Sequence, residues 1–351
     1  MADPDETVLS DVHVYLPFQR TRRENCAVTR FYICSPSMSC GGASTTAPIA
    51  GKEGGHTPGD KHLSVIEGTD YRHLSVMEGT DDRHLSVMGV MNDASNSLHP
   101  FDDDGDLVIR RRCPKHSECL DVITIEHSLS TVLKEVGLQV WRGALLLCDF
   151  LIHNERLYSG CTALELGAGV GLCSIVLARL AKRVFCTDVG DDILKNCLQN
   201  VEINSHLFKN KSDTDKTVKV RRLDWISTCL EQGSDEFSWS AEDREEMEYI
   251  KLIVAADVIY DDDLTDAFLS QILCLFASNS SRVVLLALEK RLNFTLEYLD
   301  VACPAYIHFT AKLRHLQQQG LLFTRQLPLD FPNYIQYDRV RELELWEIKP
   351  R

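Results

Sequence analysis

The chain has 351 residues, 44% of them hydrophobic and 25% charged, which suffices for two average domains or for one domain with a long extension. Its formal net charge of −15 argues against a broad nucleic-acid-binding surface, because such surfaces are basic. The charge suits a basic protein partner, and equally an acidic surface that only aids solubility. The N-terminal residues are acidic and polar, so no signal peptide is expected. No run of apolar residues reaches the length of about 18 that a membrane span needs, so no span is expected either.

The first 106 residues are predicted to be an N-terminal extension with two unlike parts. Residues 8–35 carry short segments at His13–Tyr15 and Phe31–Ile33 that predict strands packed on a later domain. Residues 36–106 are rich in Gly, Ser and Thr and contain an eleven-residue tandem repeat at 61–93. Each repeat has too few apolar residues to build a core, so we predict a disordered insertion rather than a solenoid. A docking motif is the alternative reading of the repeat.

Residues 107–351 are predicted to form one α/β domain with a doubly wound, mostly parallel sheet, because strands alternate with helices. Two strands at 107–109 and 122–125 and helical spacing over 129–153 come first. The expected strands then cover 163–166, 184–187, 218–223, 252–256, 283–288, 321–326 and 342–348, and the expected helices 170–181, 191–204 and 302–319. No helix separates the last two strands, so one of them is expected to run antiparallel. Residues 231–248, rich in Ser, Asp and Glu, are predicted to be an exposed acidic loop.

The thirteen cysteines are scattered, and none forms a C-x-x-C pair. Several lie inside apolar runs, as Cys186 does after Val184 and Phe185. This usage is typical of reduced cysteines that serve as small core residues in a cytosolic or nuclear protein. We therefore expect no structural zinc and no other metal site.

A glycine-rich turn follows the first strand of the alternating region, with Gly167, Gly169 and Gly171 at alternate positions. A dinucleotide motif, G-x-G-x-x-G, would need its third glycine at Leu172. The acid Glu165 just before the turn is a poor neighbour for a pyrophosphate and suits a ligand with cationic parts, such as S-adenosylmethionine. Bare backbone can approach such a ligand closely, although simple tight packing can also select glycines.

Acidic residues follow the next two strands. Asp188 lies 21 residues after Gly167, where a Rossmann-like fold holds the ribose hydroxyls with a carboxylate. The alternative is a helix N-cap, for which Asp191 is better placed. Asp224 and Trp225 end the third strand and could meet an adenine, or could form only a strand-end turn with a packed indole.

The fourth strand ends in Ala256 and Asp257, with Tyr260 three residues further on. The carboxyl end of this strand is expected beside the reactive end of the cofactor, so Asp257 could orient an attacking amine and Tyr260 could face its positive charge. The alternative is an Asp that caps the following turn and a Tyr in the core. Val258 and Ile259 stand where enzymes that methylate nucleic-acid amino groups carry Pro-Pro, which argues against base methylation.

These motifs together resemble the seven-strand, S-adenosylmethionine-dependent protein lysine methyltransferases of methyltransferase family 16, over residues 107–348. Most specific is the D-x-x-Y set that begins at Asp257; the others that match are Val140-Trp141, Glu165–Gly171, Thr187-Asp188, Leu223-Asp224-Trp225 and Glu289-Lys290-Arg291. The resemblance implies that Trp141, Asp224 and Trp225 line the cofactor pocket and that Asp257 and Tyr260 face the substrate amine. The chain departs from the family at Trp141-Arg142-Gly143, where many members have proline or small residues, and in its repeat-bearing insertion.

The expected function is methyl transfer from S-adenosylmethionine to the ε-amine of a lysine in a non-histone protein, by direct in-line displacement. The expected partner is a protein with an accessible lysine, such as a nuclear protein or a chaperone, and the enzyme is expected to be a monomer in the nucleus or cytosol. Two alternatives stay open at this level, because a fold does not fix a function. One is a small-molecule or nucleic-acid methyltransferase, and the other is a cofactor-binding scaffold without activity.

Overall fold

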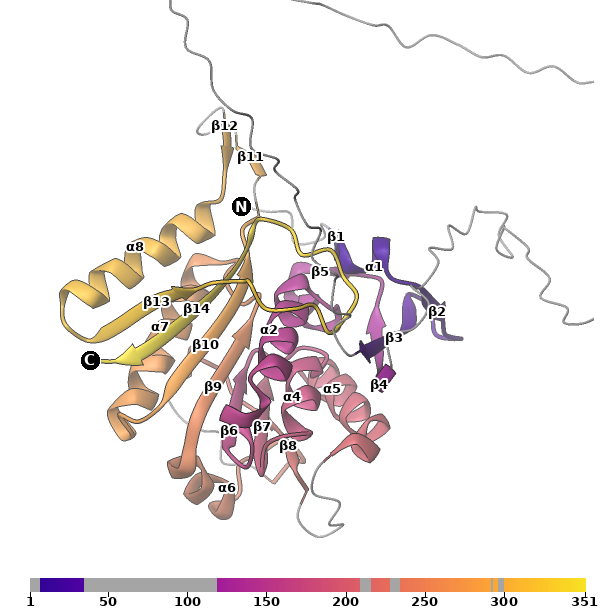
Figure 1. The fold of residues 1–351 in the computed structure, drawn as a ribbon, viewed down its shortest axis with the longest axis horizontal. Coiled ribbons are helices and arrows are strands. Elements are labelled where there is room, and N and C mark those ends of the chain that lie inside the picture. The colour runs from indigo at the N-terminus through magenta and orange to yellow at the C-terminus, as the bar shows by residue number, and fades with distance from the viewer. Residues whose placement is uncertain (1–6, 35–118, 209–215, 228–233, 292, 296–299) are drawn as a thin grey trace, which may run out of the picture. The chain divides into compact units, whose positions relative to one another are not determined.

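The computed structural model describes residues 7–34, 119–208, 216–227, 234–291, 293–295 and 300–351 (Figure 1). Residues 7–34 belong to the same compact unit as the described residues from 119 onward. The predicted disordered insertion at 36–106, the strand expected at 107–109 and the domain boundary between 106 and 107 lie outside the described residues and stay predictions.

A seven-stranded sheet forms the centre of this unit, in the order β13-β14-β10-β9-β6-β7-β8. Its strands are β6 (Thr162–Leu166), β7 (Arg183–Asp188), β8 (Val218–Arg222), β9 (Ile250–Ala256), β10 (Val283–Glu289), β13 (Leu322–Leu327) and β14 (Leu343–Pro350). Pairing is parallel from β8 to β10, whereas β14 runs antiparallel to both of its neighbours. The predicted α/β sheet with one antiparallel strand is confirmed.

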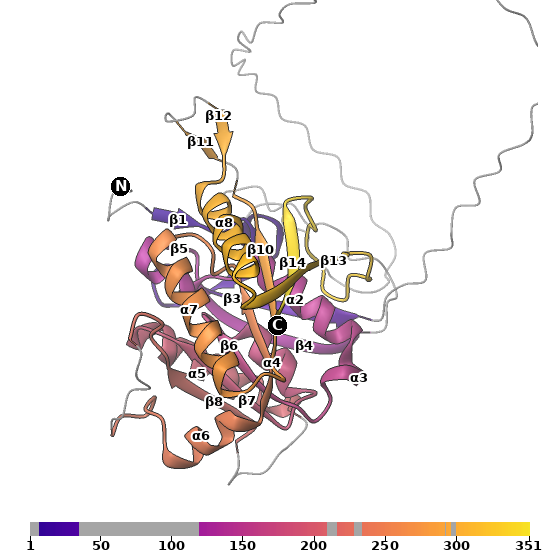
Figure 2. The same cartoon turned by 90° about the vertical axis from the view of Figure 1, so that its left-hand side faces the viewer.

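Helices cover both faces of the sheet, as Figures 1 and 2 show from two sides. On one face lie α2 (Arg142–His153), α4 (Leu172–Ala178) and α5 (Asp191–Ile203), and on the other lie α7 (Asp262–Ser278) and α8 (Pro304–Gln318). Successive strand residues point to opposite faces: Cys186 joins the core beneath α2, α4 and α5, and Phe185 joins the core beneath α7 and α8. The sheet is therefore buried on both sides, which explains its continuous apolar strands.

Several elements of the sheet region were not expected from the sequence. Helix α7 was not foreseen, although its buried residues Phe268, Leu269 and Ile272 have helical spacing. The short antiparallel pair of β11 (Asn293–Thr295) and β12 (Asp300–Ala302) was also not foreseen. Among the described residues, the stretch Leu133–His153 is long and apolar enough to cross a membrane by length and composition alone, but 61% of its most apolar window is buried in the protein.

The helical spacing over 129–153 resolves into several elements. A strand, β5 (Ser130–Val132), leads into a 3₁₀ turn, η1 (Leu133–Leu138), and the backbone is extended at Gln139 and Trp141 before α2 begins. A short helix, α3 (Glu155–Tyr158), follows. The expectation of one helical region is therefore right only for α2, because the extended break turns the chain toward the carboxyl edge of the sheet.

The N-terminal residues pack on this unit by pairing strands. Strand β1 (Thr7–Leu9) pairs with β5, and β2 (Phe18–Arg20), β3 (Cys26–Cys34) and β4 (Cys119–Ser128) form an antiparallel sheet. The strand expected at Phe31–Ile33 is confirmed, but the one at His13–Tyr15 is wrong, because residues 12–15 form the helical turn α1 (Val12–Tyr15). Side chains of Asn200 and Asn204 on α5 accept hydrogen bonds from the backbone of β4, which fixes the small sheet to the large one.

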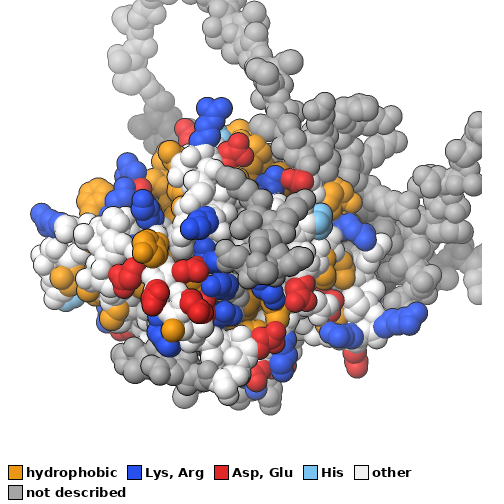
Figure 3. All heavy atoms as spheres, turned by 90° about the horizontal axis from the view of Figure 1, so that it is seen from below, with side chains coloured by type: hydrophobic (Ala, Val, Ile, Leu, Met, Phe, Trp, Pro, Cys, Tyr) orange, Lys and Arg blue, Asp and Glu red, His pale blue; other side chains and the backbone are white. Residues whose placement is uncertain are grey.

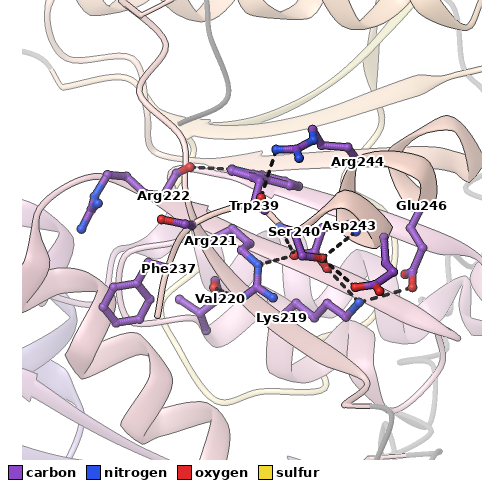
Figure 4. Close-up of polar contacts among 12 residues, drawn as sticks. Lys219, Val220, Arg221, Arg222, Phe237, Trp239, Ser240, Asp243, Arg244 and Glu246 are labelled. Carbon is purple, nitrogen blue, oxygen red and sulfur yellow. Dashed lines mark hydrogen bonds and ion pairs between the residues drawn. The ribbon is translucent and has the colours of Figure 1, made fainter. Parts of the chain in front are cut away.

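The acidic loop expected at 231–248 is wrong for the residues that the structure describes. Residues 234–240 run along the outer edge of β8, where Arg222 N donates to Phe237 O and Trp239 Nε1 donates to Arg222 O (Figure 4). Helix α6 (Ala241–Glu246) follows, and the turn η3 (Met247–Tyr249) leads into β9. The buried carboxylate of Asp243 receives the cations of Lys219 and Arg221 at 2.8 and 2.7 Å. Asp243 and Asp235 are thus paired with basic residues of β8, which composition alone does not reveal. The segment that carries them covers an otherwise open sheet edge.

Acidic and basic side chains intermingle on the face seen from below in Figure 3. Although the chain has a net charge of −15, this face therefore carries no large patch of one sign.

Candidate active site

A pocket opens at the carboxyl ends of β6, β7, β8 and β9, where the strand order changes direction between β6 and β9. It contains about 930 Å³ of empty space, a volume that includes the open solvent at its mouth. Every candidate site residue except Gly171 lines it: Trp141, Glu165, Gly167, Gly169, Asp188, Asp224, Trp225, Ala256, Asp257 and Tyr260. The structure thus brings together residues that lie up to 119 positions apart in the chain.

The glycine-rich turn owes its composition to backbone geometry and packing. Gly167, Gly169 and Gly171 have φ values of +69°, +53° and +84°, which other residues adopt only with strain. A Cβ on Gly169 would lie 2.8 Å from the carbonyl oxygen of Gly137, and one on Gly167 would lie 2.7 Å from Val258 Cγ1. The Cβ positions are taken by the protein itself, so these glycines shape the pocket wall more than they clear space for a ligand. Gly171 ends the turn as the N-cap of α4.

Asp188 holds the turn from the neighbouring strand. Its carboxylate accepts hydrogen bonds from the backbone N–H of Gly169 and of Val189, each at 2.7 Å. Burial raises the pKa of Asp188 to about 6. The N-cap alternative is wrong, because Gly190 occupies the N-cap of α5. A carboxylate has about four lone-pair directions, so two remain for hydroxyl donors from a ligand.

Glu165 lies deeper in the same wall. Its side chain is buried and accepts a hydrogen bond from Ser174 Oγ at 2.5 Å. Burial raises the pKa of Glu165 to about 7. A cationic group in the pocket would hold this carboxyl in its charged form, because an opposite charge nearby favours ionisation.

Asp224 and Trp225 form the outer wall after β8. Asp224 Oδ1 accepts the backbone N–H of Ile226 at 2.9 Å, which shows the strand-end turn that the sequence left open. The indole of Trp225 packs on Phe268 at 5.3 Å between ring centroids. Among the described residues, its buried Nε1 donor has no hydrogen-bond partner, although buried donors nearly always have one. An acceptor on a bound ligand would satisfy it.

Asp257 joins two elements at the pocket floor. Its carboxylate accepts the backbone N–H of Gly143 at 2.6 Å, in the first turn of α2, and that of Glu289 at 2.8 Å, at the end of β10. Its φ of +54° is strained for a residue other than glycine, and burial raises its pKa. The turn-capping alternative is wrong, because the carboxylate accepts from Gly143 and Glu289, which lie far from the following turn in the chain, and because Asp261 caps α7. Tyr260 is 38% exposed and lines the pocket, so it is not a core residue, and burial of its hydroxyl raises its pKa to about 12.

Trp141, the N-cap residue of α2, lines another part of the pocket wall. Its Nε1 donates to Val136 O at 2.9 Å, and the guanidinium of Arg291 lies 4.4 Å from its ring centroid. Sequence reasoning did not single out several other residues that line the pocket: Lys134, Val136, Gly137, Gln139, Ala144, Leu172, Cys173, Val189, Ile193, Val258 and Leu264. Most of these are apolar and resemble core residues, and only their position beside Trp141 or the glycine turn could have marked them.

The residues present fit S-adenosylmethionine. The unpartnered donor of Trp225, the spare acceptor positions on Asp188 and the buried acid Glu165 match a ligand with an aromatic base, a ribose and cationic groups. Among the described residues there is no cluster of three or more His, Cys, Asp or Glu side chains that could hold a metal ion.

The sheet order, its single antiparallel strand and a pocket at the point where the order reverses define the Rossmann-like methyltransferase fold. A family model described as lysine methyltransferase matches residues 121–302. Mouse methyltransferase-like protein 22 is 37% identical over 384 aligned residues, which cover 98% of this chain and 95% of that protein. Its human counterpart is 45% identical over 235 residues, 65% of this chain and 57% of that protein.

More distant relatives include protein-lysine N-methyltransferase rrg1 of Schizosaccharomyces pombe, 32% identical over 39% of this chain and 44% of that protein. Magnesium protoporphyrin IX methyltransferase of Synechocystis, solved with its methyl donor, superposes with a TM-score of 0.37 and 14% identity over 60% of this chain and 81% of that chain, too remote to bear on function. The chain belongs to the lysine methyltransferase family, and its methyl donor is S-adenosylmethionine. The predicted family, enzyme class and cofactor are confirmed.

Proposed function

We propose that this lysine methyltransferase binds its donor in the pocket between Trp141 and Trp225 and presents a lysine of a non-histone protein to it beside Asp257. The observation that carries the proposal is that one pocket holds both groups of predicted residues. The cofactor-facing Asp188 and the amine-facing Asp257 and Tyr260 line the same cavity, although they end different strands.

Four side chains are assigned to the donor. The carboxylate of Asp188 accepts the ribose hydroxyls with its two spare lone-pair directions, while the N–H of Gly169 keeps it in place. Glu165 faces the cationic part of the donor. Trp225 Nε1 donates to the adenine ring, and Asp224 accepts a hydrogen bond from the adenine amino group.

A lysine has an unperturbed pKa of about 10.4 and must lose its proton before it can attack. Entry into the pocket desolvates the ammonium, which lowers its pKa. Asp257 is held by two backbone N–H groups, so its remaining lone pairs have a fixed direction in which to accept an N–H of the amine. The ring of Tyr260 at the mouth offers a face for the approaching cation.

When bound, S-adenosylmethionine supplies a methyl group on a positively charged sulfur, which is already a good leaving group. The protein then contributes mainly orientation, which is worth about 7–11 kcal/mol in well-aligned systems. Trp141 and the glycine turn hold the donor side of the pocket, and Asp257 holds the acceptor side.

The test replaces Asp257 by Asn and compares it with Asp263→Asn, an exposed acid in the first turn of α7. We expect Asp257→Asn to lower kcat by about 100-fold or more, because it removes the negative charge and one of the two acceptor oxygens, both of which already accept a backbone N–H. Its donor Kd, measured by isothermal titration calorimetry, should stay within about threefold of the wild type, and Asp263→Asn should match the wild type in both. Normal turnover by Asp257→Asn would remove this residue from the mechanism.

The substrate class is tested by incubating lysate with the protein and labelled donor, followed by protease or nuclease digestion. Label that protease releases and that mass spectrometry assigns to lysine supports the proposal. Label released by nuclease, or found on small molecules, would favour the alternative methyltransferases. Donor binding without transfer to any pool would favour a scaffold.

We further propose that the substrate is a nuclear protein or a chaperone and that the enzyme acts as a monomer in the nucleus or cytosol. The lysine methyltransferase family supports the protein substrate, and the acidic chain suits a basic protein segment. Light scattering of the purified chain and fractionation of cells test these two points. A stable dimer or a membrane-bound fraction would contradict them.

A further inference from the structure

Arg142 belongs to the segment Trp141-Arg142-Gly143, where the chain departs from the family pattern, and the structure gives it an unusual setting. Its guanidinium is largely buried, with 9% of the side chain exposed. Nη1 contacts Glu289 Oε1 at 2.5 Å and Asp11 Oδ2 at 3.0 Å. A buried cation needs such partners, because an unpaired charge in the interior is costly.

The two backbone groups that hold Asp257 are linked through this same guanidinium. One is the N–H of Gly143, the residue after Arg142, and the other is the N–H of Glu289, the partner of Arg142. Arg142 therefore ties the start of α2 to the end of β10, and the Asp257 carboxylate lies between them. The fit is close, since a Cβ on Gly143 would lie 2.7 Å from the Asp257 carboxylate.

Asp11 brings the N-terminal segment into this arrangement. The preceding residue, Ser10, donates its N–H to Gln139 Oε1 at 2.8 Å and its hydroxyl to Val140 O. Gln139 and Val140 line the pocket. Residues 10 and 11 lie outside the part of the chain that the family model matches, 121–302. A segment from outside the family domain thus contacts both the pocket wall and Arg142.

We propose that Arg142 is a positioning residue that fixes Asp257 for the incoming amine, and that Asp11 completes its setting from the N-terminal segment. The proposal rests on the role of Asp257 in the proposed function. Asp257 has a strained φ of +54°, which persists only while its surroundings hold it. Without the link between α2 and β10, the carboxylate can turn away from the amine although the donor side of the pocket is unchanged.

The charge of Arg142 has a second consequence. The charged groups that face Asp257 are Arg142 on α2 together with Arg291 and Glu289 at the end of β10. Burial raises the pKa of Asp257, whereas Arg291 and Arg142 lower it. Loss of the Arg142 charge therefore raises this pKa further. Activity that needs the carboxylate is then lost at a higher pH on the acid side.

The experiment compares Arg142→Gln, Arg142→Lys, Asp11→Asn and the double variant of Asp11→Asn with Arg142→Gln in the full-length chain. Arg325→Gln serves as the control, because Arg325, on β13, is also paired with a carboxylate, that of Glu347. We expect Arg142→Gln to lower kcat about 10- to 100-fold, as small misplacements of a reacting group do, with a donor Kd within threefold. The acid limb of its kcat profile should move to higher pH. Arg142→Lys should be intermediate, because it keeps the charge but lacks the fork.

Asp11→Asn guards against a variant that merely unfolds, since the Asp11 side chain is 57% exposed. We expect it to lower kcat by about two- to fivefold alone and to have no further effect in the Arg142→Gln background, because residues in one network are not additive. Equal kcat values and pH profiles for Asp11→Asn, Arg142→Gln and Arg325→Gln would overturn the inference. If those are equal while Asp257→Asn is inactive, the inference fails alone; if Asp257→Asn is active, the proposed function fails.

Discussion

Alanine at Gly169 tests how the glycine turn shapes the pocket, and Gly160 provides a matched control. Both residues have positive φ, +53° at Gly169 and +74° at Gly160. A Cβ at either position costs about 1–2 kcal/mol, because L residues with a side chain disfavour the left-handed region. At Gly160 the new methyl group would meet nothing within 4 Å, whereas at Gly169 it would lie 2.8 Å from Gly137 O.

The difference between the two variants therefore isolates the contact with Gly137. That backbone oxygen must move by about 0.6 Å to reach an ordinary contact of 3.4 Å, and overpacking of this kind costs about 1–3 kcal/mol. Gly137 and Gly169 both line the pocket, and the N–H of Gly169 holds Asp188. We expect Gly169→Ala to raise the donor Kd about tenfold or more, while Gly160→Ala leaves it unchanged.

Urea unfolding gives the stability of each variant, and isothermal titration calorimetry gives the donor affinity. Both variants should lose the common backbone term, and Gly169→Ala should lose the additional term. The reasoning is refuted if Gly169→Ala unfolds at the same urea concentration as Gly160→Ala and binds the donor as tightly as the wild type.

Three further predictions concern stability. Asp243→Ala should cost about 3–5 kcal/mol in urea unfolding, because it removes the carboxylate partner of the largely buried Arg221 and leaves Lys219 with Glu246 alone. Its exposed neighbour Glu242→Ala should cost less than about 0.5 kcal/mol, and equal losses would contradict the edge-strand account. Burial lowers the pKa of His13 to about 3 and also lowers that of His127, on which His13 stacks. As the pH drops below about 6.5, these histidines are protonated in the unfolded chain before they are protonated in the folded one, so stability falls. His13→Phe should reduce this fall, and an unchanged pH dependence of stability would refute the argument. The pKa of Glu165 is raised to about 7 in the folded chain, so below this pH the folded chain keeps a proton that the unfolded chain has lost. The stability that this protonated carboxyl contributes is lost as pH rises through about 7. Glu165→Gln should therefore gain stability relative to the wild type as pH rises from 5.5 to 7.5, and should bind the donor more weakly; a constant difference would count against the buried carboxyl.

The site residues were found from sequence wherever a strand end carried a polar or glycine signal. Glu165, Asp188, Asp224 and Asp257 each stand at or just after a buried strand, and parallel strands bring such ends to one edge of a sheet. The pocket wall at Gln139 and Val140 carried no such signal, because its role depends on contacts with residues about 130 positions away. Likewise, the turn-capping role considered for Asp257 could be rejected only once its carboxylate was seen to bind the backbone of Gly143 and Glu289.

The sequence was enough to determine the α/β class, an antiparallel strand among the last two and the glycine turn with its acid, because these depend on local periodicity and backbone freedom. Which of the two strands is antiparallel was decided by the structure. Only the tertiary structure decided which charges are paired. Residues 231–248 were expected to form an exposed acidic loop, and the structure shows Lys219 and Arg221 paired with Asp243 there. Nothing in the sequence marks Arg142 as a buried cation, and the structure pairs it with Asp11 and Glu289. The energy of a charge depends on its neighbours and on its access to water, and both are set by residues far away in the chain.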